Sequence, residues 1–200
     1  MKILVVGASG TLGSAVVAEL SKRHDVISAS RSGDVKVDVK DAASIKAMFA
    51  EVGKVDAIVF TAGKAHFGPL SAMTPELMDV GIKDKLMGQV NLVLAGTEYL
   101  NDGGSFTLVS GILATEPIKA GTNASLVNGA IDSFVVAAAI ELPRGIRINA
   151  VSATVFEEAM EHYGPFFRGF KPVPVADVAL AFSRSVEGAT TGKIFKVGYV

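Results

Sequence analysis

Cysteine is missing from this chain of 200 residues. Its absence excludes disulfide bonds, thiolate nucleophiles, cysteine-ligated zinc and iron–sulfur clusters. The three histidines show no metal-ligand spacing, so we expect no metal site. An excess of one charge is missing as well, because 19 Lys and Arg face 20 Asp and Glu and leave a net charge of −1. Nucleic-acid-binding proteins usually carry a strong basic excess, and we therefore expect no nucleic-acid partner.

Long apolar runs are also missing. The run near the N-terminus, Ile3–Val6, is shorter than the about 7–15 residues of a signal-peptide core and the about 20 residues of a membrane-spanning helix. The longest run lies within Phe134–Ile140, is ended by Glu141, and is typical of a buried helix. These observations predict a cytoplasmic protein with no membrane partner.

Apolar residues nonetheless make up 50% of the chain and charged residues 20%, which is the composition of a folded domain and not of a disordered chain. A chain of this length suits one domain, 1–200, with a complete hydrophobic core. Glycine occurs 21 times, above its usual share of about 7%, so its positions are informative.

Strand and helix patterns alternate along the chain. Short apolar runs predict strands at Ile3–Val6, Val26–Ser30, Val35–Val39, Val55–Phe60, Phe106–Val109, Ile146–Val151 and Lys193–Val197. Apolar residues at helical spacing predict helices over 11–23, 41–52, 74–100 (with a break near Gly81), 124–142 and 175–186. A turn is predicted at Asn101–Gly104, and an irregular segment at 153–173. This alternation predicts an α/β fold: a doubly wound parallel β-sheet of Rossmann type, with about seven strands and helices on both faces.

Three glycines follow the first predicted strand at a spacing of three residues, at Gly7, Gly10 and Gly13. Between a strand and a helix, such glycines permit a tight turn, a close approach of backbone to a pyrophosphate, and close packing of helix on sheet. The free N–H groups of the helix N-terminus then face the phosphates. The loop therefore predicts a dinucleotide site that includes Gly7, Ser9, Gly10, Thr11, Leu12 and Gly13. The alternative is a glycine-rich turn that binds no ligand.

The end of the second predicted strand indicates which dinucleotide is bound. An Asp or Glu about 20 residues beyond the glycines would bind the ribose 2′-OH of NAD. Here the chain has Ser30, Arg31 and Ser32, and a guanidinium flanked by hydroxyls suits the 2′-phosphate of NADP. The alternative is an ordinary exposed arginine.

Two further strand ends are predicted to contact the same cofactor. Asp38 and Val39 follow the third predicted strand and are expected at the adenine edge. Thr61, Ala62 and Gly63 follow the fourth, where small residues let the cofactor lie against backbone.

The glycine loop, Arg31, Asp38–Val39 and Thr61–Gly63 resemble motifs of the short-chain dehydrogenase/reductase family. Similar motifs follow at Gly104–Ser110, Gly145–Ser152 and Thr191–Val197, so the resemblance covers nearly the whole chain. It implies an oxidoreductase that transfers hydride between NADP(H) and a carbonyl or alcohol. The chain is short for this family, which implies that 153–173 is a short substrate-side segment.

The resemblance fails at the catalytic residues. Members usually have a Ser after the fifth strand, a Tyr-x-x-x-Lys on the next long helix, and an Asn on the helix before. The Tyr is the general acid/base, and the Lys lowers the pKa of that Tyr and holds the nicotinamide ribose. In this sequence the Ser, Tyr, Lys and Asn positions fall on Gly111, Ala124, Asn128 and Lys85. No tyrosine here has a Lys four residues later, so this loss does not depend on the register.

Several residues are candidates to replace the missing groups. Ser110 is the predicted catalytic residue, although a strand-end Ser that bonds to nearby backbone is an equal alternative. Asn128 is expected to bond to the ribose without supplying charge. Lys85 could restore a positive charge, but a solvated lysine is the favoured interpretation. His66 lies on a loop at the right sheet edge, and Glu157, Glu158, His162 and Tyr163 lie in the substrate-side segment.

The predicted helix at 124–142 is apolar on nearly all sides. The sheet covers one side, and family members often dimerise through this helix and the one before it. We therefore expect a homodimer or homotetramer, with cover by the protein's own loops as the alternative.

These observations predict an NADP(H)-dependent short-chain oxidoreductase with non-standard catalytic residues and an unidentified small-molecule substrate. A catalytically inactive NADP(H)-binding redox sensor or scaffold is the main alternative. Epimerisation or dehydration on the same fold is a third, because fold alone does not decide the reaction.

Overall fold

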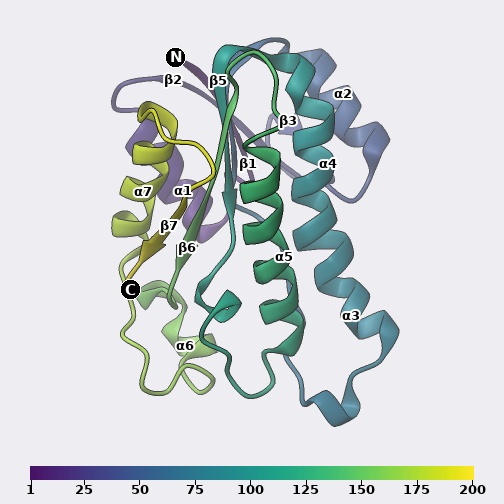
Figure 1. Cartoon of the computed structure of the whole chain (residues 1–200), viewed down its shortest axis with the longest axis vertical. Helices are drawn as coiled ribbons and strands as arrows, with labels where there is room; N and C mark the ends of the chain where they lie inside the picture. The colour runs from purple at the N-terminus through teal and green to yellow at the C-terminus, as the bar shows by residue number, and fades with distance from the viewer.

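The computed structural model describes all 200 residues and contains one seven-stranded parallel sheet (Figure 1). Its strands are β1 (Lys2–Val6), β2 (Asp25–Ser30), β3 (Val35–Lys36), β4 (Val55–Phe60), β5 (Leu100–Val109), β6 (Arg147–Ala153) and β7 (Ile194–Val197). The order across the sheet is β3-β2-β1-β4-β5-β6-β7. The prediction of a doubly wound Rossmann-type sheet is therefore confirmed.

Helices cover both faces of the sheet (Figure 1). α1 (Thr11–Leu20) and α7 (Val175–Glu187) pack together on one face, and α2 (Ala42–Val52), α4 (Met87–Gly96) and α5 (Thr122–Ala138) lie on the other. Two shorter helices, α3 (Pro75–Gly81) and α6 (Met160–Tyr163), lie at the carboxyl end of the sheet. Short 3₁₀ turns occupy Leu70–Ala72, Thr97–Tyr99, Ile112–Ala114 and Glu157–Ala159.

Two apolar clusters hold these layers together. The main core is continuous, and its largest fully buried side chains include Phe49, Phe60, Phe106 and Phe182, each of which contributes about 2–3 kcal/mol by leaving water. A second cluster lies beyond the carboxyl ends of the strands and is formed by Ile112, Leu113, Ala124, Val155 and Phe167. The segment 153–173 thus packs on the sheet edge where ligands bind in such folds.

Two predicted details are wrong. Residues Asn101–Gly104 are not a turn but belong to β5, where the register to β4 shifts between Val55 and Ala57 and Gly103 takes a φ of +73°. The guanidinium of Arg144 donates to the Leu100 carbonyl and to Asp102, which holds this stretch against the sheet.

The predicted helix break near Gly81 is also wrong. A π-helical turn at Ile82–Leu86 joins α3 to α4, so the helical chain continues through it. The predicted start of this helix is confirmed, because Thr74 caps it and Pro75 is its first residue.

None of the helices combines the length and the apolar character needed to cross a bilayer.

Gly13 sets the contact between α1 and the sheet. A Cβ built on Gly13 would lie 2.1 Å from the Gly7 carbonyl oxygen and 2.8 Å from the Ala8 Cα. Both atoms belong to the backbone of the β1–α1 turn, so no side-chain rotation relieves the clash. The expected role of this glycine in helix–sheet packing is therefore visible in the structure.

We predict that Gly13→Ala lowers the free energy of unfolding by about 3 kcal/mol, because the backbone turn must shift to admit the methyl group. Gly129→Ala is the matched control, since Gly129 lies in α5 and a Cβ there meets nothing within 4 Å. The control is expected to raise stability by up to about 1 kcal/mol through helix propensity. Urea denaturation measures both values, and equal changes in the two variants would contradict this account of the packing.

Candidate functional site

Two cavities open at the carboxyl edge of the sheet, and Gly63 lines both of them. The first extends between the ends of β1, β2 and β4, where the strand order reverses direction. This reversal is where open α/β sheets bind nucleotides. The second lies between the ends of β5 and β6, the start of α5 and the segment 153–173.

The first cavity, the nucleotide cleft, measures about 180 Å³. Ten of the predicted cofactor residues line it, namely Gly7, Ser9, Gly10, Ser30, Arg31, Asp38, Val39, Thr61, Ala62 and Gly63. Four others, Thr11, Leu12, Gly13 and Ser32, lie outside its lining, and Asn128 lines the second cavity. Sequence reasoning missed Val6, Val37, Lys40, Lys64 and Asp84, of which only Lys40 carries a signal, as a cation directly after Asp38–Val39.

The glycine loop fits a phosphate group. Gly7 has a φ of +91°, and a Cβ on it would lie 2.6 Å from the Ala62 Cβ, so this turn admits only glycine. A Cβ on Gly10 would meet nothing closer than 3.5 Å, which leaves this backbone open to the cleft. No side chain caps the N-terminus of α1 at Gly10, so its N–H groups remain available to an anion.

Arg31 is exposed at the other end of the cleft and forms no ion pair. Lys40 lines the same cleft and is also without an ion pair. Asp38 turns its carboxylate back onto the chain, where Oδ1 accepts the Lys40 N–H at 3.0 Å. Two free cations therefore lie where a phosphate on the adenosine ribose would be held.

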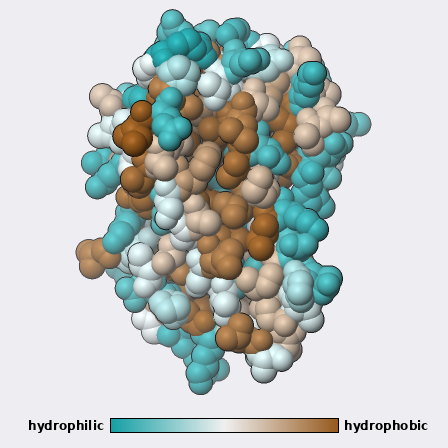
Figure 2. All heavy atoms as spheres, turned by 45° about the vertical axis from the view of Figure 1, so that its right-hand side comes forward, coloured by the Kyte–Doolittle hydropathy of each residue, from teal (hydrophilic) through white to brown (hydrophobic).

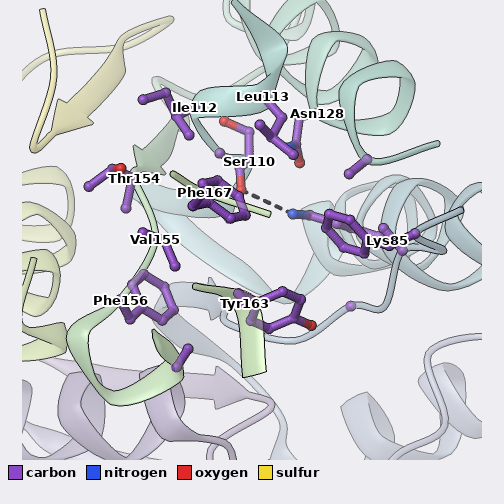
Figure 3. A pocket seen from close by; sticks show the side chains of 17 residues that line it. Lys85, Ser110, Ile112, Leu113, Asn128, Thr154, Val155, Phe156, Tyr163 and Phe167 are labelled. Atoms are coloured by element: carbon purple, nitrogen blue, oxygen red, sulfur yellow. Dashed lines mark hydrogen bonds between the residues drawn. The ribbon is translucent and has the colours of Figure 1, made fainter. Parts of the chain in front are cut away.

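The second cavity, the apolar pocket, measures about 190 Å³ (Figure 3). Most of its lining is aliphatic or aromatic, and includes Phe67, Ile112, Leu113, Val155, Phe156, Tyr163 and Phe167. Its polar side chains are Lys85, Ser110, Asn128 and Thr154, apart from the Tyr163 hydroxyl. The structure thus brings together two predicted site residues: Ser110, which directly follows β5, and Asn128 of α5.

Three oxygens in this pocket have no hydrogen-bond partner within the protein: Ser110 Oγ, Asn128 Oδ1 and Thr154 Oγ1. All three residues are buried. The Asn128 amide nitrogen lies 3.0 Å from the position of a Cβ built on Gly111, so this amide occupies space beside the glycine. Buried polar atoms are normally paired, so these three oxygens keep the capacity to form a further hydrogen bond.

Lys85 is the cation of the apolar pocket. It lies on the π-helical turn, and its Nζ donates to the Ser110 carbonyl at 3.0 Å (Figure 3). Burial lowers the pKa of Lys85 from 10.5 to about 8, an effect that the Asp132 carboxylate opposes. The favoured interpretation of Lys85 as a solvated lysine is therefore wrong, because the π-turn directs its side chain inward. π-turns within helices occur frequently at functional sites.

Gly63 makes room for this lysine. Its φ is +123°, and a Cβ on it would lie 2.8 Å from Lys85 Cγ and 3.0 Å from Lys85 Cα. The Lys85 stem therefore passes directly over Gly63 at the boundary between the two cavities. Any other residue at position 63 would displace it.

Gln89 anchors the π-turn. Its side chain is fully buried, and its amide donates to the carbonyls of Lys85 and Val109 while it accepts the Val109 N–H at 2.8 Å. The pairing of β4 with β5 ends at Val59 and Thr107, so β4 offers no backbone partner to Val109. The Gln89 side chain bonds to both backbone groups of Val109 in place of a strand. On the other side of the turn, Asp84 accepts the Lys64 N–H at 2.8 Å.

Asp132 lies behind Ser110 on α5. Burial raises the pKa of Asp132, while the Ser110 hydroxyl and the charges of Lys85 and Lys196 act in the opposite direction. Its Oδ1 has no hydrogen-bond partner.

The remaining candidates divide between pocket and surface. Tyr163 lines the apolar pocket, but His66, Glu157, Glu158 and His162 line neither cavity. His66 is held through its N–H by Asn123 Oδ1 at 2.8 Å, and Glu158 accepts the Val175 N–H.

Comparison with known sequences finds similarity to oxidoreductases. A protein-family model described as Enoyl-(Acyl carrier protein) reductase matches residues 1–198. A curated relative, the uncharacterised oxidoreductase YmfI of Bacillus subtilis, is 31% identical over 164 residues, which are 73% of this chain and 66% of YmfI. The chain thus spans slightly less than two thirds of the length of YmfI.

Comparison with solved structures extends over almost the whole chain. The protein lin1944 of Listeria innocua superposes with a TM-score of 0.96 and 55% identity, and the match covers 98% of both chains. A small-chain dehydrogenase in complex with NADPH superposes with a TM-score of 0.88 and 25% identity, over 98% of this chain and 96% of that one.

We predict that Gln89→Leu destabilises the protein by about 2–3 kcal/mol, because it leaves the buried Val109 N–H and carbonyl without partners. Gln89→Glu keeps the shape of the side chain and its acceptor for the Val109 N–H, but it removes the amide donor to the carbonyls of Val109 and Lys85. A loss of stability is therefore expected for this variant as well. Thermal and urea unfolding measure both. An unchanged midpoint in Gln89→Leu would show that the Gln89 hydrogen bonds do not hold the turn.

Proposed function

The chain belongs to the short-chain dehydrogenase/reductase family, and from this premise we propose that it is an NADP(H)-dependent oxidoreductase acting on a carbonyl or alcohol substrate. The observation that supports this most directly is the nucleotide cleft, in which an uncapped helix N-terminus and a glycine turn face two unpaired cations, Arg31 and Lys40. A structural relative at 25% identity is in complex with NADPH.

Each part of the cleft has a role in this proposal. The N–H groups at the start of α1, beside Gly10, bind the pyrophosphate. Arg31 binds the 2′-phosphate through its guanidinium, assisted by Lys40. Asp38 and Val39 border the adenine, and Thr61–Gly63 present backbone to the cofactor as it runs toward the apolar pocket. When bound, NADPH supplies the hydride.

The catalytic groups are non-standard in this proposal. Gly111, Ala124 and Asn128 stand at the positions where the family usually has its Ser, Tyr and Lys, and all three line the apolar pocket. Ala124 cannot exchange a proton, so the proton must come from another residue or from water. Ser110 remains a candidate to bond to substrate, because it lines the pocket and its buried hydroxyl, which lies toward Asp132, forms no hydrogen bond.

The replacement of the usual tyrosine by Ala124 also favours the alternative, a catalytically inactive NADP(H)-binding redox sensor or scaffold. The two functions differ in one measurement. The oxidoreductase consumes NADPH in the presence of small ketones or aldehydes, whereas the sensor binds NADPH and consumes none.

We further propose that the protein is a homo-oligomer that uses the face formed by α4 and α5. Four large apolar side chains on this face are exposed, namely Leu94, Leu126, Val136 and Ile140, although Ile140 lies just past the end of α5. Figure 2 shows apolar atoms gathered along the middle of this side of the molecule. The occupant proposed for this face is a second copy of the chain, in keeping with the pairing common in the family.

We predict that Arg31→Ala raises the Kd for NADPH about 10- to 100-fold and changes the Kd for NADH less than threefold, because only NADPH has the 2′-phosphate. Fluorescence titration of the reduced cofactors measures both constants. Lys22→Ala is the matched control, since it removes one positive charge at an exposed site outside the cleft. Equal affinities of the unaltered protein for the two cofactors, or an unchanged preference in Arg31→Ala, would refute this role.

We predict that light scattering gives a dimer or tetramer at micromolar concentration, and that Val136→Glu shifts it toward monomer by placing a charge in the apolar contact. Leu180→Glu is the matched control, because Leu180 on α7 has the same 55% exposure on the opposite face of the sheet. It is expected to leave the α4–α5 pairing intact. A monomeric wild-type protein would remove the oligomer proposal.

A further inference from the structure

The Lys85 ammonium group has one partner where it could have three. Its Nζ donates to the Ser110 carbonyl and forms no ion pair, so two N–H groups remain for another acceptor. The unpaired oxygens of Ser110, Asn128 and Thr154 belong to the same pocket. The unused donors of Lys85 and these unpaired oxygens therefore belong to residues that line one cavity, whose other walls are mostly apolar.

We propose that Lys85 binds the carbonyl oxygen of the substrate and protonates it during reduction, and that this substrate is a small, uncharged molecule with an apolar body. The proposal rests on the proposed function, because the hydride comes from NADPH. In this proposal the general acid is Lys85, on the π-turn between α3 and α4, whereas the family usually has a tyrosine on α5 in that role.

The position of Lys85 favours contact with substrate over contact with cofactor. Lys85 lines the apolar pocket but does not line the nucleotide cleft, although its neighbour Asp84 does. Its stem crosses Gly63, which lines both cavities. The ammonium group thus stands on the substrate side of the boundary, within reach of a group held next to the cofactor.

The pocket itself indicates the class of substrate. At about 190 Å³ it is smaller than the about 300–1,000 Å³ of most ligand sites, so it suits a small molecule. Lys85 is the one charged residue in its lining, and Phe67, Phe156 and Phe167 supply aromatic walls. If Lys85 binds the carbonyl oxygen of the substrate, the lining has no second cation that could pair with a carboxylate on the same molecule. This favours an uncharged substrate.

The reduction balances with the groups named. The carbonyl carbon accepts the hydride, the π electron pair of the C=O bond moves to oxygen, and oxygen takes a proton from Lys85 Nζ. The products are an alcohol, the oxidised cofactor and a neutral lysine. Lys85 recovers its proton from water through the mouth of the pocket, and the reverse sequence oxidises an alcohol.

The charges around Lys85 suit this exchange. The Asp132 carboxylate on α5 favours the charged form, and Asp132 itself interacts with Lys196 and Tyr199. Asp84, on the same turn, is bonded to the Lys64 N–H, and Tyr163 is the other titratable group of the pocket. Because the pKa of Lys85 is lowered to about 8, the side chain is mostly protonated at pH 7 and still releases its proton readily. Reduction is therefore expected to slow as the pH rises through about 8, and oxidation to accelerate.

Binding without cofactor tests the carbonyl contact. The probe is benzamide, an uncharged carbonyl compound with an apolar body, titrated into the protein and followed by NMR shifts. Lys85→Met is expected to raise the Kd about 10-fold, because a hydrogen bond from a charged donor is lost. Lys83→Met is the matched control on the same turn, since Lys83 is 69% exposed and pairs only with Asp79. Equal affinity in Lys85→Met and wild type would overturn the contact.

Kinetics test the proton transfer. With NADPH and cyclohexanone or benzaldehyde, Lys85→Met is expected to lower kcat about 100-fold or more, to abolish the fall in rate near pH 8, and to leave the Kd for NADPH within threefold. Lys85→Gln, checked by thermal unfolding, repeats the test if the Met variant does not fold. Lys85→Arg is expected to retain binding but not the rate, because its guanidinium does not release a proton.

The possible failures are distinct. No NADPH consumption by the wild-type protein contradicts the proposed function and the proton transfer together. Wild-type turnover that Lys85→Met retains, with the same pH profile, overturns the role of Lys85 alone. The role of Lys85 is also overturned if Tyr163→Phe removes activity and Lys85→Met does not. It is overturned as well if saturating NADPH restores the rate of Lys85→Met, because the variant would then have lost only cofactor affinity. A preference for pyruvate over the uncharged compounds would overturn the substrate class.

Discussion

The hydrogen bond from Lys85 to the Ser110 carbonyl is the interaction on which the site depends, because it fixes a cation at the boundary between the nucleotide cleft and the apolar pocket. Three features make it possible. The π-turn aims the side chain inward, Gln89 ties that turn to the end of β5, and Gly63 leaves space for the lysine stem. All three features act on the position of Lys85, and two of them have a second role: Gln89 pairs with the end of β5, and Gly63 lines the nucleotide cleft.

The cost of burying this ammonium group shapes the electrostatics nearby. A charge removed from water is normally paired, yet the partly buried Lys85 has only a carbonyl and a carboxylate, Asp132, that is too distant for an ion pair. Burial disfavours the charged forms of both residues and moves both pKa values toward neutrality. Opposing shifts of this kind in one cleft are typical of sites that exchange protons, although structural charge networks produce them too.

The fold and the nucleotide cleft were largely predictable from sequence, because both depend on local rules. Strand–helix alternation predicts the sheet, and Gly7, Gly10 and Gly13 have spacings that follow from turn geometry, as the clash at Gly13 shows. The apolar pocket was less predictable. The family motif places Lys85 at the usual Asn position, but the π-turn and the contact with the Ser110 carbonyl arise only from tertiary structure, as does the strand-like role of Gln89. For the same reason, the turn predicted at Asn101–Gly104 was overridden by contacts with Arg144.

The central claim is that Lys85 is a partly buried cation in the site, and the most direct measurement is its own titration. With lysine labelled at Cε with ¹³C, the Lys85 signal is assigned by its loss in Lys85→Arg and followed by NMR from pH 6 to 12. The account predicts a midpoint near 8, against the ordinary value of 10.5. A midpoint at the ordinary value would place the ammonium group in water and contradict the account.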